Sequence, residues 1–346
     1  MKYRQIKDIK VSEVGMGCWA IGGNQFGNSY GSTDDTESLK AIKRAVELGC
    51  NFFDTADVYG HGHSEELLGL ALNKVREKVI IATKVGGAYM YEQGAAIVRH
   101  NEEQSSSRVY NNEKWGHVNF SPEYIEFALE QSLHRLKASY IDIYQLHNPS
   151  LKMIKEGEVF KPLRKLQKEG KIKLVGVSVH TLDEGVAALE HADVIQCVFN
   201  MIDPRNYELL ESAKQMGIGI IVREPLANGF LSGKYNKDSE FENGDIRNRM
   251  PSQYIEELTA LVEEIEGRFK HRLLEEQTPT NDAQSASKHN GVDRCTLSQI
   301  ALRYILMFNS VSTVIPGAKT AWQVEQNMNA SGIAPLTEKE MEILGS

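Results

Sequence analysis

Long apolar segments are absent from this sequence of 346 residues. No stretch approaches the roughly 20 consecutive apolar residues that a membrane-spanning helix requires. Residues 1–10 alternate charged with apolar side chains and contain no apolar run of signal-peptide length. We therefore expect a cytoplasmic protein that has no membrane partner.

Paired cysteines and an excess of positive charge are also missing. The 39 Lys and Arg residues are outnumbered by 47 Asp and Glu residues, which gives a net charge of −8. Nucleic-acid binding needs Lys and Arg gathered on one face, so small-molecule partners are favoured over nucleic acid. Assembly into a homo-oligomer is also compatible with this composition. No Cys-x-x-Cys pair suggests a metal site, and we expect reduced core thiols at Cys18, Cys50, Cys197 and Cys295.

A glycine-rich dinucleotide-binding loop is the third absence. The glycines around the first predicted strand do not have the Gly-x-Gly-x-x-Gly spacing; they are Gly15, Gly17, Gly22 and Gly23. This argues against an open, doubly wound sheet. A nicotinamide cofactor would have to be held by another architecture.

Eight short apolar segments alternate with amphipathic segments after a hairpin-like start at residues 2–12. Nearly continuous hydrophobicity is typical of parallel strands that are buried on both faces. Eight such strands joined by helices predict an α/β fold, a (β/α)8 barrel, as one domain over residues 1–346. The predicted strands are 14–20, 51–55, 79–85, 141–147, 174–179, 194–200, 218–223 and 311–316.

Helix start signals agree with this alternation. Asp34, Ser121 and Thr181 are expected to be N-caps, because each precedes a helical pattern with an acidic first turn. In the last strand–helix segment, Trp322 and Val324 are expected to form a packing face.

Three stretches interrupt the alternation and are predicted to be loop insertions: 86–120, 226–250 and 275–293. The first follows the strand that ends near Lys84, and loops after the strands line the active face of a barrel. We expect it to form one wall of a substrate pocket, with Tyr89 and Trp115 in contact with the substrate. A loop that packs only on itself is the alternative.

Four polar residues end or follow three neighbouring predicted strands: Asp54, Tyr59, Lys84 and His147. A buried lysine needs a counter-charge, which Asp54 can supply, and the ammonium would then lie near the Tyr59 hydroxyl. Positive neighbours favour a phenolate, so we expect Lys84 to lower the pKa of Tyr59. A phenol tuned in this way, beside an imidazole, can give a proton to a carbonyl oxygen at neutral pH. The group predicts reduction of a C=O bond.

At these four positions the chain resembles the aldo-keto reductase family, whose tetrad has the same residues in the same order and spacing. The resemblance runs from about Tyr3 to Ala330. It implies a (β/α)8 barrel that reduces an aldehyde, ketone or sugar-type carbonyl with NAD(P)H. Within the family, the chain resembles the branch that contains bacterial reductases and the β-subunits of potassium channels. Trp19, Tyr59 and His147 would contact the substrate.

The resemblance also implies cofactor contacts. Ser178 and Gln196 would bind the nicotinamide carboxamide, and Arg223 would stack on the nicotinamide ring. The implied set is Trp19, Ser178, Gln196, Arg223, Pro225, Leu226, Asn228, Gly229, Leu231, Ser232, Lys234, Pro316, Gly317, Ala318, Lys319, Thr320, Gln323, Gln326 and Asn327.

Cofactor choice depends on the last strand–helix junction. Basic, hydroxyl and amide groups at a helix N-terminus are typical of a phosphate site. By resemblance, Lys319 and Thr320 would meet the adenosine 2′-phosphate, and Gln326 and Asn327 the adenine. We expect NADP(H) for this reason. Gln323 stands where the family often has Arg, which leaves NAD(H) open.

Two other functions are compatible with the same residues. The protein could act as an NAD(P)-dependent dehydrogenase of a sugar or secondary alcohol, because the acid and the base are one group in two protonation states. Alternatively, it could be a non-catalytic regulatory subunit that keeps the fold and the cofactor site.

Overall fold

The computed structural model describes residues 1–25, 29–87, 109–112, 116–273, 288–289, 292–293 and 295–345. Its main sheet has eight parallel strands in the order β14-β11-β10-β9-β8-β5-β4-β3. They are β3 (Met16–Gly17), β4 (Phe52–Asp54), β5 (Ile80–Val85), β8 (Ile141–His147), β9 (Ile172–Ser178), β10 (Val194–Val198), β11 (Gly219–Arg223) and β14 (Thr313–Val314). Each strand overlaps one of the eight apolar segments, so the predicted strands are confirmed.

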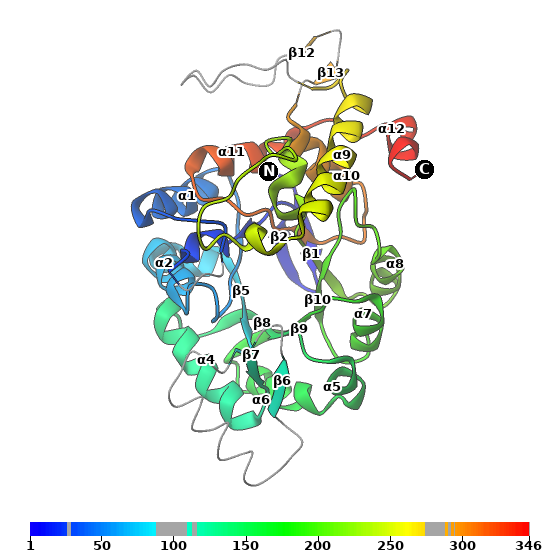
Figure 1. Cartoon of the computed structure of the whole chain (residues 1–346). Coiled ribbons are helices and arrows are strands. Elements are labelled where there is room, and N and C mark those ends of the chain that lie inside the picture. Colours follow the sequence, from blue (N-terminus) through cyan, green and yellow to red (C-terminus); the bar gives the residue numbers. More distant parts are fainter. Residues whose placement is uncertain are drawn as a thin grey trace.

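Two bridges close this sheet into a barrel. Val14 pairs with Val314, and Gly17 pairs with Gly317, which joins the chain around β3 to the chain around β14. The predicted (β/α)8 barrel is confirmed. Helices surround the strands (Figure 1): α1 (Asp35–Glu47), α2 (His63–Leu72), α4 (Pro122–Leu136), α5 (Leu151–Glu156), α6 (Lys161–Lys168), α7 (Leu182–Ala188), α8 (Tyr207–Gln215), α9 (Ser252–Arg268), α10 (Leu297–Leu306), α11 (Ala321–Asn329) and α12 (Glu338–Gly345).

The expected N-terminal hairpin fills one end of the barrel. Its strands, β1 (Tyr3–Ile6) and β2 (Ile9–Ser12), pair antiparallel. The side chains of Ile6 and Val11 are buried against apolar residues near the starts of the barrel strands. The opposite end, where the strands finish, is therefore the end left for a site.

The predicted helix caps are present. The side chains of Asp34, Ser121 and Thr181 each accept a hydrogen bond from the backbone N–H three residues later. The expected packing face of α11 is wrong in part, because Val324 is buried whereas Trp322 is 64% exposed. Residues i and i+2 of an α-helix lie about 200° apart around the helix axis, so the side chains of Trp322 and Val324 cannot share a face.

The three predicted insertions contain short regular elements. Within 86–120 there is a hairpin, two 3-10 helices lie in 226–250, and a second hairpin lies at the end of 275–293. These elements are β6 (Val109–Asn112), β7 (Gly116–Asn119), η4 (Ala227–Ser232), η5 (Ile246–Arg249), β12 (Lys288–His289) and β13 (Val292–Asp293).

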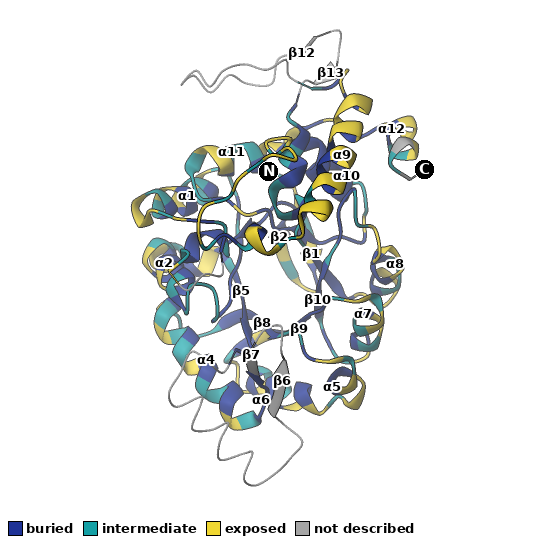
Figure 2. Cartoon of the chain, viewed as in Figure 1, coloured by how far each residue is buried: buried dark blue, intermediate teal, exposed yellow. Residues whose placement is uncertain are grey.

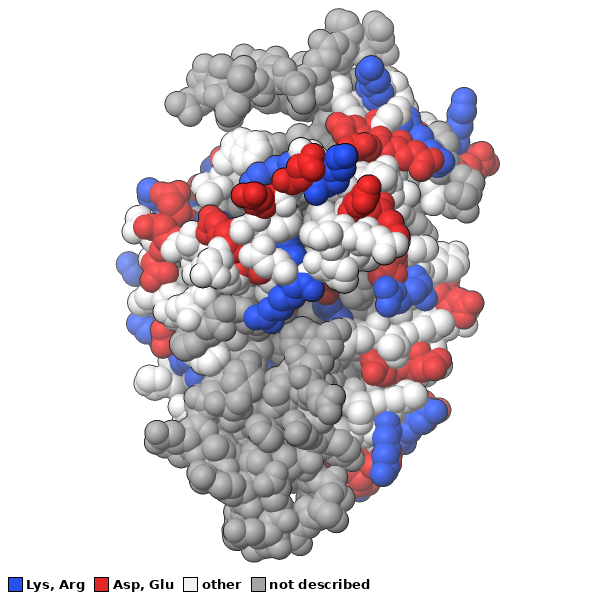
Figure 3. Space-filling view, in the orientation of Figure 1, with Lys and Arg blue, Asp and Glu red and all other residues white. Residues whose placement is uncertain are grey.

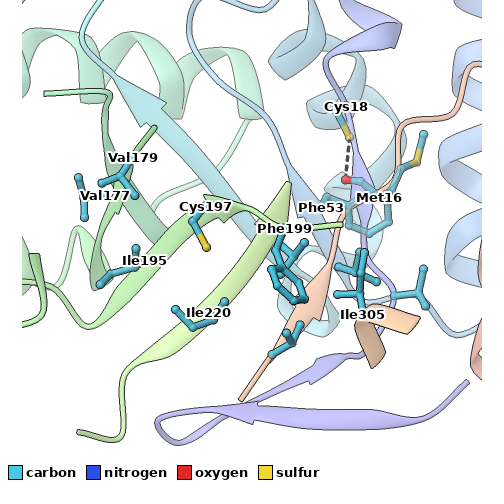
Figure 4. Close-up of a cluster of buried hydrophobic side chains, with 14 of the residues drawn as sticks. Met16, Cys18, Phe53, Val177, Val179, Ile195, Cys197, Phe199, Ile220 and Ile305 are labelled. Carbon is cyan, nitrogen blue, oxygen red and sulfur yellow. Dashed lines mark hydrogen bonds between the residues drawn. The ribbon is translucent and has the colours of Figure 1, made fainter. Parts of the chain in front are cut away.

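Burial follows the barrel plan: the strands are buried and the helices expose their outer faces (Figure 2). The four cysteines are buried, free thiols. Cys18 and Cys197 lie among apolar side chains (Figure 4), and burial raises the pKa of Cys197 to about 12. These thiols are core residues rather than nucleophiles.

Charges of both signs are interspersed over the described part of the face in Figure 3. None of the helices in the described ranges combines the length and the apolarity needed to cross a bilayer. The described residues also contain no group of three or more His, Cys, Asp or Glu placed to hold a metal ion.

Candidate active site

A pocket of about 1190 Å³ lies at the ends of the barrel strands. Most residues of the predicted site line it: Trp19, Asp54, Tyr59, His147, Ser178, Gln196, Arg223, Pro225, Leu226, Asn228, Gly229, Lys234, Pro316, Gly317, Ala318, Lys319 and Gln323. Other predicted residues lie outside this lining: Lys84, Leu231, Ser232, Thr320, Gln326 and Asn327. Tyr89 and Trp115 fall outside the described residues.

Lys84 links two members of the predicted tetrad. Its ammonium donates to Asp54 Oδ1 at 2.6 Å, to the Thr55 carbonyl at 2.8 Å and to the Tyr59 hydroxyl at 3.1 Å. Lys84 is 1% exposed, and Asp54 is 2% exposed. Barrel strands β4 and β5 are adjacent, which brings the carboxylate and the ammonium together at their ends.

Aromatic side chains pack against the Tyr59 ring. The His147 ring stands perpendicular to the Tyr59 ring, with 6.1 Å between centroids. Trp19 stacks on Tyr59 at 6.0 Å and contacts the edge of Tyr30 at 5.0 Å. These rings fix the position of the phenol at the pocket wall.

The pKa shifts define the protonation states at neutral pH. Burial lowers the pKa of Lys84, but Asp54 and Tyr59 more than offset this, so its pKa is raised and the ammonium is kept. Burial, together with the charges of Lys84 and Arg223, holds the pKa of His147 well below its usual range, so its imidazole is neutral. The pKa of Tyr59 is raised, because burial outweighs the lowering by Lys84. This corrects the expectation of a lowered phenol pKa: Lys84 acts in the predicted direction, but burial is larger.

Asp54 has further donors on its other oxygen. The amide of Gln196 donates to Asp54 Oδ2 at 2.7 Å, and the amide of Gln145 donates to it at 3.3 Å. Gln196 was expected from the resemblance as a cofactor ligand, and here its nitrogen is directed at Asp54. Gln145 was missed, although an amide inside an apolar strand segment is a signal that it has a buried partner.

Arg223 is held at the pocket wall by neighbours from two strands. Its guanidinium pairs with the Glu224 carboxylate, and it donates to the Val179 carbonyl at 3.0 Å. It also lies 3.0 Å from His180 Nδ1. His180 follows β9 and was not among the predicted site residues.

The Lys319 ammonium forms hydrogen bonds with other residues of the protein. It donates to the Tyr30 carbonyl and, at 2.9 Å, to the Ser32 carbonyl. The backbone N–H of Lys319 donates to the Gln323 side chain at 2.7 Å, and Thr320 caps α11. Of the two predicted phosphate ligands, Lys319 lines the pocket and Thr320 does not, and the Lys319 ammonium already has two carbonyl partners.

Residues from the segment 239–250 line one part of the pocket. The Glu242 carboxylate accepts from the backbone and the hydroxyl of Ser32, at 2.9 and 2.8 Å. The backbone N–H of Ile246 donates to the Ser29 carbonyl at 2.9 Å. Tyr30 completes the junction, since its hydroxyl donates to Asn228 at 2.7 Å. Ser32 and Glu242 are 210 residues apart in sequence, so no local pattern predicts this contact.

Known proteins are similar to this chain over most of its length. Residues 19–346 match the Aldo/keto reductase family. The NADH-specific methylglyoxal reductase of Escherichia coli (strain K12) is 30% identical, over 94% of this chain and 91% of that protein.

Two solved structures resemble the fold. The holo form of aldo-keto reductase AKR11C1 from Bacillus halodurans is 28% identical with a TM-score of 0.71, and the match covers 100% of this chain and 95% of the other. The glycerol dehydrogenase AKR11B4 from Gluconobacter oxydans is 26% identical with a TM-score of 0.72, and the match covers 99% and 94%.

Proposed function

This chain belongs to the aldo-keto reductase family, and from that premise we propose that Tyr59 is the proton donor of its carbonyl reduction. The family's general activity, NAD(P)H-dependent reduction of carbonyl compounds by an oxidoreductase, holds for the chain. One observation carries the assignment: the buried Lys84 ammonium contacts both Asp54 Oδ1 and the Tyr59 hydroxyl, which borders the pocket.

Residues that line the pocket fit a nicotinamide dinucleotide. Gln196 Oε1 is buried at the lining and has no hydrogen-bond partner among the described residues, so it can accept from a carboxamide. Gly17 and Gly317 leave the pocket floor free of side chains. A bound NAD(P)H would supply the hydride.

The chain's own residues handle the proton. Tyr59 gives its phenolic proton to the carbonyl oxygen, and the Lys84 ammonium stabilises the phenolate that forms. Neutral His147 can donate a second hydrogen bond to the same oxygen. Donors placed in advance around a developing oxyanion are worth roughly 10²-fold or more in rate. Asp54 keeps the ammonium in place.

The Tyr59→Phe variant tests the proton-donor assignment. We expect its turnover to fall by roughly 10²-fold or more, while the NADPH dissociation constant from fluorescence titration stays within about twofold, since the ring stack is kept. Tyr207→Phe, which changes an exposed tyrosine outside the pocket lining, is the matched control. If Tyr59→Phe reduces generic aldehydes at the parent rate, Tyr59 is not the donor.

For the cofactor we propose NADP(H) as the preferred form, with NAD(H) also accepted. The start of α11 favours a phosphate dianion, but the Lys319 ammonium must leave the carbonyls of Tyr30 and Ser32 to reach it. The similar E. coli protein is an NADH-specific reductase, which also supports acceptance of NAD(H). We expect the two reduced cofactors to bind within about tenfold of each other, or about 1.4 kcal/mol.

The Lys319→Ala variant tests this choice. It should weaken NADPH binding and leave NADH binding unchanged, as measured by fluorescence quenching. An equal loss for both cofactors would show that Lys319 supports the pocket structure and does not discriminate the phosphate.

For the substrate we propose a hydroxylated aldehyde or ketone. The pocket wall carries hydrogen-bonding groups from several loops: Asn148, His180, Asp203, Arg205 and Glu224. Among the described residues, Asn148 Oδ1 is buried without a hydrogen-bond partner, directly after His147 in the chain. A substrate hydroxyl would supply the missing donor.

A matched pair of aldehydes tests this proposal. Asn148→Ala should raise the KM for glyceraldehyde and leave the KM for propanal unchanged. Equal effects on both aldehydes would remove the hydroxyl contact from the proposal.

The same site could work as a dehydrogenase of a polyol, and the glycerol dehydrogenase among the similar structures favours this second candidate. Rates with each cofactor form at one pH decide the direction. A non-catalytic regulatory role has no such observation in its favour.

A further inference from the structure

The amide nitrogens of two buried glutamines beside Asp54 have no part in the proton transfer described above. Gln145 lies in β8 and Gln196 in β10, and both are 0% exposed. Both donate from Nε2 to Asp54 Oδ2, at 3.3 and 2.7 Å, and Gln196 Nε2 lies 3.4 Å from Gln145 Oε1. Lys84 occupies the other oxygen, Oδ1. The two carboxylate oxygens therefore have separate sets of donors.

The sheet leaves space for Gln145 to reach Asp54. In the β8–β9 register Gln145 pairs with Gly176. A Cβ on Gly176 would lie 2.6 Å from Gln145 Cγ, which is closer than two non-bonded carbon atoms approach in proteins. A glycine at this position therefore lets the glutamine side chain lie inside the barrel.

An amide suits this position because it donates without titrating. A buried carboxylate oxygen that lacks hydrogen-bond donors carries an uncompensated desolvation penalty. Lys84 cannot serve both oxygens, since it is shared with the Thr55 carbonyl and the Tyr59 hydroxyl. A hydrocarbon at 145 would leave Oδ2 with one donor, and the carboxylate would be free to rotate away from Lys84.

We propose that Gln145 is a positioning residue of the reaction: with Gln196 it orients Asp54 toward Lys84, and so holds the ammonium beside the Tyr59 hydroxyl. The inference rests on the proposed function, in which Tyr59 gives the proton. Gln145 is outside the pocket lining, so it acts only through Asp54 and touches neither substrate nor cofactor. Gln196 does line the pocket, which makes Gln145 the cleaner residue to test.

Other titratable groups that interact electrostatically with Asp54, Lys84 or Tyr59 come from several elements: Cys18, Asp57, His147 and Arg223. Burial holds the pKa of Cys18 and of Asp57 well above the usual range, and burial holds the pKa of His147 well below it. A pH dependence that a variant at 145 has and the parent lacks is therefore assigned to residue 145, because the parent carries the same Cys18, Asp57 and His147.

Two variants of Gln145 and one control make the test. Gln145→Leu removes the amide at similar size. Gln145→Glu keeps the shape and adds a proton that can be lost. The control is Gln167→Leu, because Gln167 donates to the Asp193 carboxylate at 3.1 Å and lies outside the pocket lining.

For Gln145→Leu we expect kcat to fall roughly 10- to 100-fold, which is the effect of removing the hydrogen-bond partners that orient metal ligands in metalloenzymes. The KM and the NADPH dissociation constant should stay within about threefold. The basic limb of the kcat profile should move to lower pH, because Asp54 is what raises the pKa of Lys84 against burial. The control should change none of these quantities.

For Gln145→Glu we expect a new pH dependence. At low pH the introduced carboxyl is protonated and donates to Asp54, so activity is kept. As pH rises the carboxyl loses its proton and repels Asp54, so kcat falls through a limb that the parent lacks.

The outcomes separate the two hypotheses. If Gln145→Leu behaves like the control, with kcat and pH profile unchanged, the positioning role is overturned. If Gln145→Leu does not fold, Gln145→Glu decides, and a parent-like profile overturns the role. An active Tyr59→Phe variant would instead refute the proposed function, whatever the result at Gln145.

Discussion

Removing the buried ammonium should be the most destabilising change at the site. Lys84→Met keeps the length of the side chain and deletes the charge. It removes the donors to Asp54, to the Thr55 carbonyl and to Tyr59, at 2.6, 2.8 and 3.1 Å. Asp54 then remains as a buried anion whose described cationic partner is gone.

The magnitude follows from burial. Breaking a buried ion pair by removing one partner costs about 3–5 kcal/mol, because the remaining charge is uncompensated. A domain is stable by only about 5–15 kcal/mol, so Lys84→Met should lose a large part of that. Lys173 offers a contrast: it pairs with Asp142 at 2.7 Å but is 46% exposed, and Lys173→Met should cost within about 1 kcal/mol.

Urea unfolding followed by circular dichroism measures these free energies. A double-mutant cycle with Asp54→Asn adds a second criterion: the double variant should lose less than the sum of the two single variants, since it leaves no unpaired charge. A loss below about 1 kcal/mol in Lys84→Met, or additive losses in the cycle, would refute the argument that this pair is buried and coupled.

Two further predictions use other parts of the structure. Gly60→Ala should destabilise the fold and reduce activity, because Gly60 has a φ of +59° and an added Cβ would collide with the Gly22 carbonyl; a melting temperature equal to that of the parent would contradict this. The pKa of His63 is raised, because Asp35 and Glu66 more than offset the lowering by burial. The stabilisation by protonated His63 should be fully present below its ordinary pKa of 6.5, and it should be lost as pH rises through the raised pKa of the folded protein. His63→Gln should therefore lower the melting temperature at pH 5 but not at pH 8.5.

The barrel was predictable because its strands are buried on both faces and read as uninterrupted apolar segments. The family resemblance, confirmed by the match over residues 19–346, rested on residues at the strand ends. Parallel strands bring such residues to one end of the barrel, and the structure places Asp54, Tyr59, Lys84 and His147 there.

What could not be predicted depends on tertiary surroundings. The sign of the Tyr59 shift is set by burial, which a count of neighbouring charges does not include. The carbonyl partners of Lys319 come from a loop 289 and 287 residues away. The exposure of Trp322 could have been foreseen, because helical geometry separates it from Val324.

The closure of the barrel has a consequence for how binding can be observed. β14 has two residues and pairs with β11 at two positions, whereas β8 and β9 pair at six. The chain around β3 is joined to the chain around β14 by two single bridges, Val14 with Val314 and Gly17 with Gly317, so the backbone amides of this seam should exchange with deuterium before those of β8. Gly17 and Gly317 at this seam line the pocket. A ligand seated there would slow the exchange, so hydrogen–deuterium exchange can report cofactor binding without any turnover.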